Sequence, residues 1–346
     1  MPNAYLPMSV LRSQKRLRRP GGINPERERP VELTAVVPDM NPRVPMGAED
    51  KKGVVSVGER DANRVIEDQL DTRVHALEDV SRCDVLFYSG PIYPLASEWI
   101  KDALEALPEK RRSILFLLET DGGFAHVAER IALILRHHYK RVAFLIPSEA
   151  MSAGTILVMS GDEIYMDYAS MLGPIDPQVR RQGRGYVPAL GYLEQYERLV
   201  KKANEGGLTS AEMTYMDESF DPAEMYQYEQ ETELSIALLE EWLAKYKFRN
   251  WRKTETQGNK VTAKMRKSRA KEIAEKLNDT KRWHSHSRGI PMAVLRDDLK
   301  LLINDFGADD ELGPAVQGYY HLLKDYSFKR DHMGFVLHTK ERYLGY

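Results

Sequence analysis

The sequence contains a single cysteine, Cys83, among its 346 residues. One cysteine cannot form an internal disulfide or supply a metal site with several cysteine ligands, and this scarcity is typical of proteins in a reducing cytosol. We expect Cys83 to pack beside the first strand of the core.

Long apolar runs and a strong net charge are also missing. No run approaches the roughly 18 apolar residues of a membrane helix, and the N-terminus lacks the apolar segment of a signal peptide. The net charge of −2 does not favour nucleic acid as a partner. No phosphate-binding loop is present, so ATP hydrolysis would need a separate protein. We expect a soluble, cytoplasmic protein without a membrane anchor, a cofactor or a metal site.

Strand and helix patterns alternate along the middle of the chain. Short apolar runs at 84–88, 113–118, 141–146 and 163–166 predict buried strands, and residues 96–107 and 124–138 have the apolar spacing of helices. This order predicts an α/β fold with a mostly parallel sheet. Sites in such sheets form beyond the carboxyl ends of the strands.

Three segments at these strand ends combine small residues with one reactive side chain: 119–123 (ETDGG), 150–155 (AMSAGT) and 172–178 (LGPIDPQ). Gly122 and Gly123 leave backbone N–H groups able to bind an anion. Ser152 lies where a strand passes into a helix, next to the N–H of Ala153, as in a nucleophile beside an oxyanion donor. Small residues at helix starts also serve as caps, so the order of the three segments favours catalysis more than any one of them does.

These segments resemble the serine dehydrogenase proteinase family, a branch of the Clp protease and crotonase superfamily that is also related to signal peptide peptidase A. The resemblance extends to 84–91 (DVLFYSGP) and 283–290 (WHSHSRGI) and covers about residues 70–345. It implies a Clp protease/crotonase-like core with flanking helices and a helical C-terminal extension. It also implies a Ser-Asp-His triad, which maps onto Ser152, Asp176 and His286, with His284 as the next candidate for the histidine.

The resemblance implies a serine peptidase that acts on polypeptides and assembles as a homo-oligomer, with a separate ATPase or adaptor as a further partner. In this scheme Ser152 forms the acyl-enzyme, His286 is the base, Asp176 orients it, and the N–H groups of Gly122, Gly123 and Ala153 hold the oxyanion.

A rival base is lysine. The signal peptide peptidase relatives use a Ser-Lys dyad with the lysine about 50 residues after the serine, and Lys201 and Lys202 follow Ser152 by 49 and 50 residues. A buried lysine with a lowered pKa could serve as the base. Motifs support the triad and only spacing supports the dyad.

Two other functions stay open. One is a crotonase-like acyl-thioester enzyme, in which the oxyanion donors hold an enolate and Ser152 is incidental. The other is an oligomeric scaffold without catalysis.

The composition divides the chain into three parts. Residues 1–55 are rich in proline and basic residues and predict a disordered or extended arm. We expect the catalytic core over 56–220, and over 221–346 a helical extension that completes the active site and an oligomer interface. Within it, Asp221-Pro222 predicts the start of a long helix, and a further helix is expected over 291–306.

Overall fold

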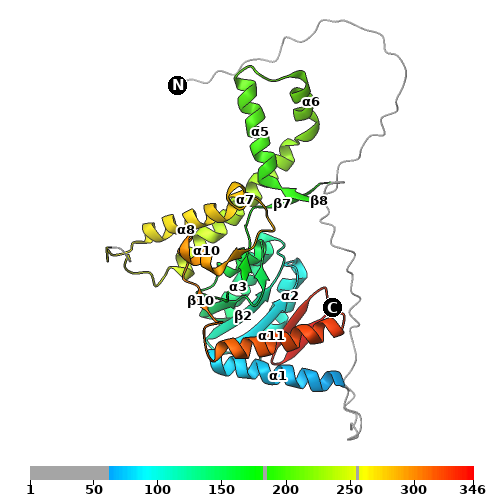
Figure 1. Ribbon diagram of the computed structural model, residues 1–346, viewed down its shortest axis with the longest axis vertical. Coiled ribbons are helices and arrows are strands. Elements are labelled where there is room, and N and C mark those ends of the chain that lie inside the picture. The colour runs from blue at the N-terminus through cyan, green and yellow to red at the C-terminus, as the bar shows by residue number, and fades with distance from the viewer. Residues whose placement is uncertain (1–61, 182–184, 255–256) are drawn as a thin grey trace, which may run out of the picture. The chain divides into compact units, whose positions relative to one another are not determined.

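The computed structural model describes residues 62–181, 185–254 and 257–346 (Figure 1). The arm predicted over 1–55 lies outside these residues. None of the described helices has both the length and the apolar character needed to cross a membrane.

The core is a seven-stranded sheet with the order β10-β5-β3-β2-β1-β11-β12. Its central strands run parallel, and helices connect each of them to the next, so the predicted α/β fold with a mostly parallel sheet is confirmed. The central strands are β1 (Asp84–Ser89), β2 (Ser113–Glu119), β3 (Arg141–Leu145) and β5 (Glu163–Met166), connected by α2 (Pro94–Glu105), α3 (Ala125–His138) and α4 (Ala153–Val158).

Both faces of this sheet are buried, which explains why its strands are continuous apolar runs. Val85 and Phe87 of β1 pack in one cluster with α1 (Ala62–Ser81) and α11 (Leu312–Lys329). Leu86 and Tyr88 point to the other face, where they pack in a larger cluster with α2, α3 and α4. Figure 1 shows α1 and α11 side by side, in agreement with their contacts. Cys83 is buried next to β1, as expected.

The C-terminal part is mostly helical, as expected, but it also adds strands to the main sheet. The hairpin of β11 (Val336–Thr339) and β12 (Arg342–Gly345) extends the sheet beyond β1. In it, β11 pairs antiparallel with β1, and β12 pairs antiparallel with β11. At the opposite edge, β10 (Asn304–Asp305) pairs in parallel with β5.

The prediction of a helix over 291–306 is wrong in its length, because α10 covers only Met292–Asp297. From residue 299 to 303 the chain alternates between buried and exposed side chains, with Leu299, Leu301 and Ile303 inside. The helix therefore ends well before residue 306, Lys300 has a positive φ of 49°, and the chain continues into β10.

A helical layer covers the face of the sheet that carries α3 and α4. The predicted cap at Asp221 is confirmed, because its carboxylate accepts hydrogen bonds from the N–H groups of Ala223 and Glu224. Leu239 and Leu243 of this layer are fully buried in the core cluster. Its elements are α7 (Pro222–Trp242), the π-helix η1 (Leu243–Lys247), α8 (Ala263–Asn278) and α9 (Thr280–Trp283).

A smaller cluster of buried residues lies apart from the two main ones, around Leu199, Phe220 and Tyr228. It joins the start of α7 to two preceding helices, one of which, α6, has no buried residue. The elements before α7 are the hairpin β7 (Gln178–Arg181) and β8 (Gly185–Pro188), α5 (Ala189–Asn204) and α6 (Ser210–Ser219).

Candidate active site

A second, three-stranded sheet begins where β2 ends. Thr120 pairs in parallel with Ala150 of β4 (Glu149–Ala150), β4 runs parallel to β6 (Met171–Leu172), and β6 runs antiparallel to β9 (Ile290–Pro291). The carboxyl ends of β4 and β6 and the amino end of β9 therefore point the same way. Because Ser152 follows β4, Asp176 follows β6 and His286 precedes β9, this sheet brings all three to one edge.

Ser152 has an unusual backbone conformation, with φ 51° and ψ −116°. A positive φ in a residue with a side chain is strained, and such strain gathers at functional sites. The Ser152 side chain does not cap α4, is partly exposed, and is flanked by the buried residues Met151 and Ala153. This sharp turn between a strand and a helix is the geometry of a nucleophile elbow.

The glycine turn lies against Ser152. A Cβ atom on Gly122 would stand 2.8 Å from Cβ of Ser152, and one on Gly123 would stand 2.3 Å from the carbonyl oxygen of Ile92. Both glycines have positive φ. No larger residue could let the two turns approach so closely.

Two of the three expected oxyanion donors are free among the described residues. The N–H groups of Gly123 and Ala153 make no hydrogen bond there. On either side of Gly123, the N–H of Ile92 donates to the carbonyl of Gly122 and the N–H of Phe124 donates to the carbonyl of Ile92. The amide of Gly123 therefore points away from Ile92. The N–H of Gly122, in contrast, donates to Thr120 Oγ1 at 3.0 Å. An oxyanion hole made from this turn therefore rests on Gly123 and Ala153.

The carboxylate of Asp176 lies 3.0 Å from Nδ1 of His286. Its side chain is 1% exposed, that of His286 is 20% exposed, and Gln178 donates to the other carboxylate oxygen at 2.9 Å. A buried carboxylate with two partners holds the imidazole ring in one orientation and leaves Nε2 as the nitrogen available for proton transfer. No hydrogen bond joins Ser152 to His286 in the described part of the chain, and such bonds are often long in the absence of substrate.

Residues 48–215 match the family model of ClpP-like SDH-type serine proteinases. Over this stretch, just under half of its length, the chain is similar to that family. Two uncharacterised proteins of Methanocaldococcus jannaschii are 37% and 31% identical to it over 147 residues, which are 41% of this chain and 48% of each relative. The chain thus spans about half the length of the curated relatives it matches.

Two solved structures of the 1510-N membrane-bound stomatin-specific protease are also similar. A serine-to-alanine variant has 19% identity and a TM-score of 0.28, and covers 42% of this chain and 74% of its own. A lysine-to-alanine variant in complex with a substrate peptide has 15% identity and a TM-score of 0.40, and covers 75% and 85%. We transfer no residue roles at this level of similarity.

The rival bases lie in other surroundings. His284 ends α9 in the left-handed conformation and is exposed. Lys201 is exposed, and Lys202 Nζ lies 2.6 and 2.8 Å from the two carboxylate oxygens of Glu212. Both lysines belong to α5, which contributes to the separate small cluster and not to the core around Ser152.

Several carboxylates lie in or directly before the glycine turn and the Ser152 turn. Glu149 precedes the Ser152 turn, and burial together with the nearby charges of Asp121 and Glu119 raises the pKa of its carboxyl group. Glu119 ends β2 and is compensated by Lys324, whose Nζ lies 2.7 Å away.

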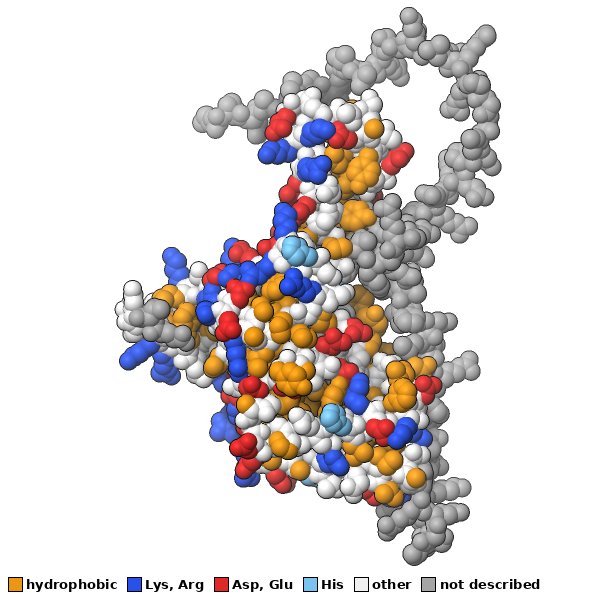
Figure 2. Space-filling model, viewed as in Figure 1, with side chains coloured by type: hydrophobic (Ala, Val, Ile, Leu, Met, Phe, Trp, Pro, Cys, Tyr) orange, Lys and Arg blue, Asp and Glu red, His pale blue; other side chains and the backbone are white. Residues whose placement is uncertain are grey.

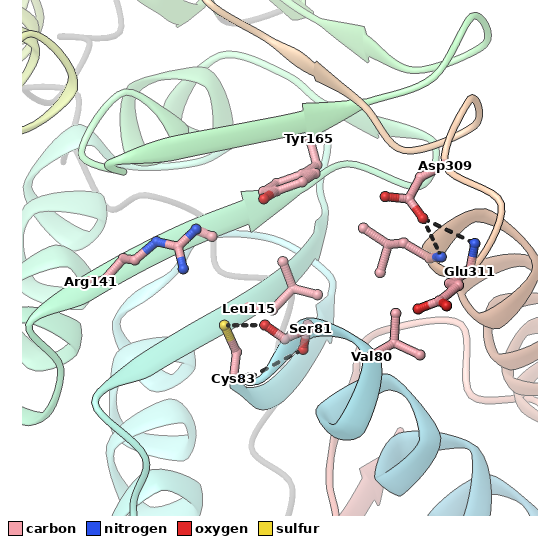
Figure 3. A pocket seen from close by; sticks show the side chains of 10 residues that line it. Val80, Ser81, Cys83, Leu115, Arg141, Tyr165, Asp309 and Glu311 are labelled. Atoms are coloured by element: carbon pink, nitrogen blue, oxygen red, sulfur yellow. Dashed lines mark hydrogen bonds between the residues drawn. The ribbon is translucent and has the colours of Figure 1, made fainter. Parts of the chain in front are cut away.

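A pocket of about 180 Å³ lies away from this site, near the amino ends of β1 and β3 (Figure 3). Its polar groups already have partners: the Cys83 thiol donates to the carbonyl of Ser81, Arg141 binds Glu163, and Asp309 accepts from the N–H groups that follow it. Burial raises the pKa of the Cys83 thiol, which opposes the reactive thiolate. We assign no chemistry to this pocket.

Sequence reasoning missed the side chains that hold the turns in place. Thr155 Oγ1 lies 2.8 Å from the carbonyl oxygen of Ala150 and 2.9 Å from both the N–H and the carbonyl oxygen of Gly173, and so links the Ser152 turn to the segment that leads to Asp176. Thr120 orients the Gly122 amide. Gln178 belongs to the third motif, where its sequence position alone indicates no role. Only tertiary contacts identify these three residues.

Proposed function

We propose that this protein is a serine peptidase that cleaves polypeptides through an acyl-enzyme on Ser152. The observation that carries the proposal is the buried Asp176–His286 pair at the same edge of the small sheet as Ser152. The match of residues 48–215 to the family model supports the reaction class. The activity of the whole protein is part of the proposal, because the curated relatives are matched over only half their length.

The mechanism follows from the free atoms of the site. Ser152 Oγ attacks the carbonyl carbon of the peptide bond, and its proton passes to Nε2 of His286, whose imidazolium form Asp176 stabilises. The N–H groups of Gly123 and Ala153 donate to the oxyanion of the tetrahedral intermediate. Collapse of the intermediate breaks the C–N bond, and the leaving amine takes the proton. Water then hydrolyses the ester by the same route.

The first test is labelling with a fluorophosphonate probe, with adducts counted by intact mass. Wild type should take one adduct, Ser152→Ala none, and His286→Ala should react about 10³-fold or more slowly, as expected for loss of a triad base. His284→Ala is the matched control, since it removes an exposed histidine two residues away, and it should label like wild type.

Two outcomes would overturn the proposal. If labelling survives in His286→Ala and is lost in Lys201→Ala or Lys202→Ala, the Ser-Lys dyad replaces the triad. If the wild type takes no adduct in any assembly state, the peptidase proposal fails and the acyl-thioester and scaffold functions are next to be assayed.

Assembly into a homo-oligomer is also part of the proposal. Exposed apolar side chains gather on α6 and the start of α7, where Met213 is 61%, Tyr215 48% and Tyr226 63% exposed. Figure 2 shows hydrophobic side chains on this part of the surface. Such a patch favours contact with a second copy. Light scattering on wild type and on Tyr215→Glu would test it, since the added charge should lower the assembly state. A cytoplasmic location and a separate ATPase or adaptor stay predictions.

A further inference from the structure

The hydroxyl of Tyr320, on α11, lies against Glu119 at the end of β2, on the face of the sheet that α11 covers. It donates a hydrogen bond to Glu119 Oε2 at 2.7 Å, and Lys324, one helical turn further, donates to Oε1 at 2.7 Å. Both oxygens of this carboxylate are therefore held from one helix. Glu119 is the residue directly before Thr120, which opens the glycine turn.

Burial and the Glu119 carboxylate raise the pKa of Tyr320 well above its ordinary value, so the hydroxyl stays the donor in this bond. The segment that precedes the Ser152 turn is anchored separately, because the carbonyl oxygen of Ser148 accepts from the N–H of Met171 at 2.8 Å.

Between these two anchor points the turns are bonded to each other. The N–H of Thr120 donates to the carbonyl of Glu149 at 3.0 Å, and the N–H of Met151 donates to the carbonyl of Thr120 at 2.8 Å. Thr120 Oγ1 in turn holds the amide of Gly122. A movement of Glu119 would therefore be passed to the glycine turn and to the Ser152 turn together.

We propose that Tyr320 is a positioning residue that sets the distance between the N–H groups of Gly123 and Ala153, the two donors of the oxyanion hole. The proposal rests on the function proposed above. Its physical basis is that the two donors come from separate turns, and that a displacement of about 1 Å in a catalytic group costs on the order of 100-fold in rate. Tyr320 bonds to Glu119, the residue before the glycine turn, and touches neither the substrate nor Ser152.

The test compares Tyr320→Phe with Tyr319→Phe, its neighbour on the same helix. Tyr319 is fully buried and its hydroxyl binds Nδ1 of His338, so Tyr319→Phe also removes one hydroxyl, but the bond it loses joins α11 to β11, where His338 also binds Asp71 of α1. The maximal rate of phosphonylation, kinact, should fall about 10- to 100-fold in Tyr320→Phe with KI unchanged. In Tyr319→Phe, kinact should stay within about twofold while the midpoint of urea unfolding falls.

A purely structural role for Tyr320 would lower stability without changing kinact, and that result would overturn the proposal. The double variant Tyr320→Phe/Glu119→Gln adds a second criterion. It should react no more slowly than the slower single variant, since both changes break the same hydrogen bond between Tyr320 and Glu119. Fully additive losses would mean that Tyr320 does not act through Glu119.

An NMR measurement separates failure of this proposal from failure of the proposed function. The backbone amide resonances of Gly122, Gly123 and Ala153 should shift in Tyr320→Phe and stay in place in Tyr319→Phe. If the wild type is never phosphonylated but these shifts occur, the positioning role holds and the peptidase function fails. If the resonances stay in place in both variants, the positioning role fails whatever the enzyme does.

Discussion

Asp176 Oδ1 and His286 Nδ1 lie 3.0 Å apart although 110 positions of sequence separate the two residues. The carboxylate is almost completely buried while the imidazole keeps a fifth of its side chain exposed. Burial of an unpaired carboxylate would cost several kcal/mol, so the pair stabilises the fold as well as fixing the ring. The exposed side of the ring is the side that can exchange a proton with a substrate.

Asp176→Asn should slow phosphonylation of Ser152 by about 10³- to 10⁴-fold. The amide nitrogen of asparagine would face Nδ1 as a donor and force the proton onto Nε2, which then cannot accept the serine proton. The measurement is the second-order labelling rate. Asp221→Asn is the control, because asparagine caps α7 as well as aspartate does. A loss smaller than about tenfold would show that Asp176 does not set the tautomer.

Thr155→Val should lower the free energy of unfolding by about 2 kcal/mol. Valine keeps the shape of the side chain, but the buried N–H of Gly173 loses its acceptor and a buried carbonyl loses its donor. Urea unfolding followed by circular dichroism measures the change. Thr155→Ser retains the hydroxyl and should recover at least half of the loss. Equal stability of the valine and serine variants would contradict a role for these bonds.

Gly123→Ala should prevent the glycine turn from forming and abolish labelling of Ser152. The added Cβ would stand 2.3 Å from the carbonyl oxygen of Ile92, so the backbone has to move. Gly191→Ala is the matched control. Gly191 lies in α5 with no atom within 4 Å of an added Cβ, and alanine there should raise stability by about 0.5 kcal/mol without changing the labelling rate. A normal labelling rate in Gly123→Ala would exclude the turn from the site.

The sequence was sufficient for the central sheet because each parallel strand is buried on both faces and is therefore a continuous apolar run. Ser152 and Asp176 were expected beyond the ends of the core strands, but the strands that they directly follow are β4 and β6. The small sheet could not be predicted, since β4, β6 and β9 are only two residues long each and carry no period. Yet this small sheet brings His286 to the same edge as Ser152 and Asp176.

Other features depend on contacts that have no local pattern. His284 and His286 stand in one polar segment, and only the bond to Asp176 distinguishes them. Tyr320 lies 201 positions from Glu119, and nothing near either residue in the sequence indicates their bond. The segment over 299–303 alternates in burial but not in sequence, because the exposed Leu302 is apolar, and we expected a helix there because Pro291 and Gly307 have the positions of helix ends.

Lys247 should make the stability of the protein depend on pH between about 8 and 10.5. Burial lowers the pKa of its ammonium group to about 8, against the attraction of Glu163 and Asp162, while the unfolded chain keeps the ordinary value of 10.5. Below pH 8 the lysine is charged in both states, so the folded state bears the full cost of burying the charge. Between the two pKa values only the unfolded state binds the proton, and stability therefore rises with pH in this window.

Lys247→Met should accordingly stabilise the protein at pH 7, where the charge is removed, and lose this advantage as the pH approaches 10.5. One pKa unit corresponds to about 1.4 kcal/mol, so we expect a gain of about 2 kcal/mol at pH 7, after allowing for the partial exposure of Lys247. Urea unfolding of both proteins at pH 7, 8, 9 and 10 measures the difference. Lys245→Met is the control, because Lys245 lies two residues away and its side chain is exposed. The stability difference between this variant and wild type should not change with pH. A gain that stays constant from pH 7 to 10 would mean that methionine acts through packing and that the ammonium group is not destabilising.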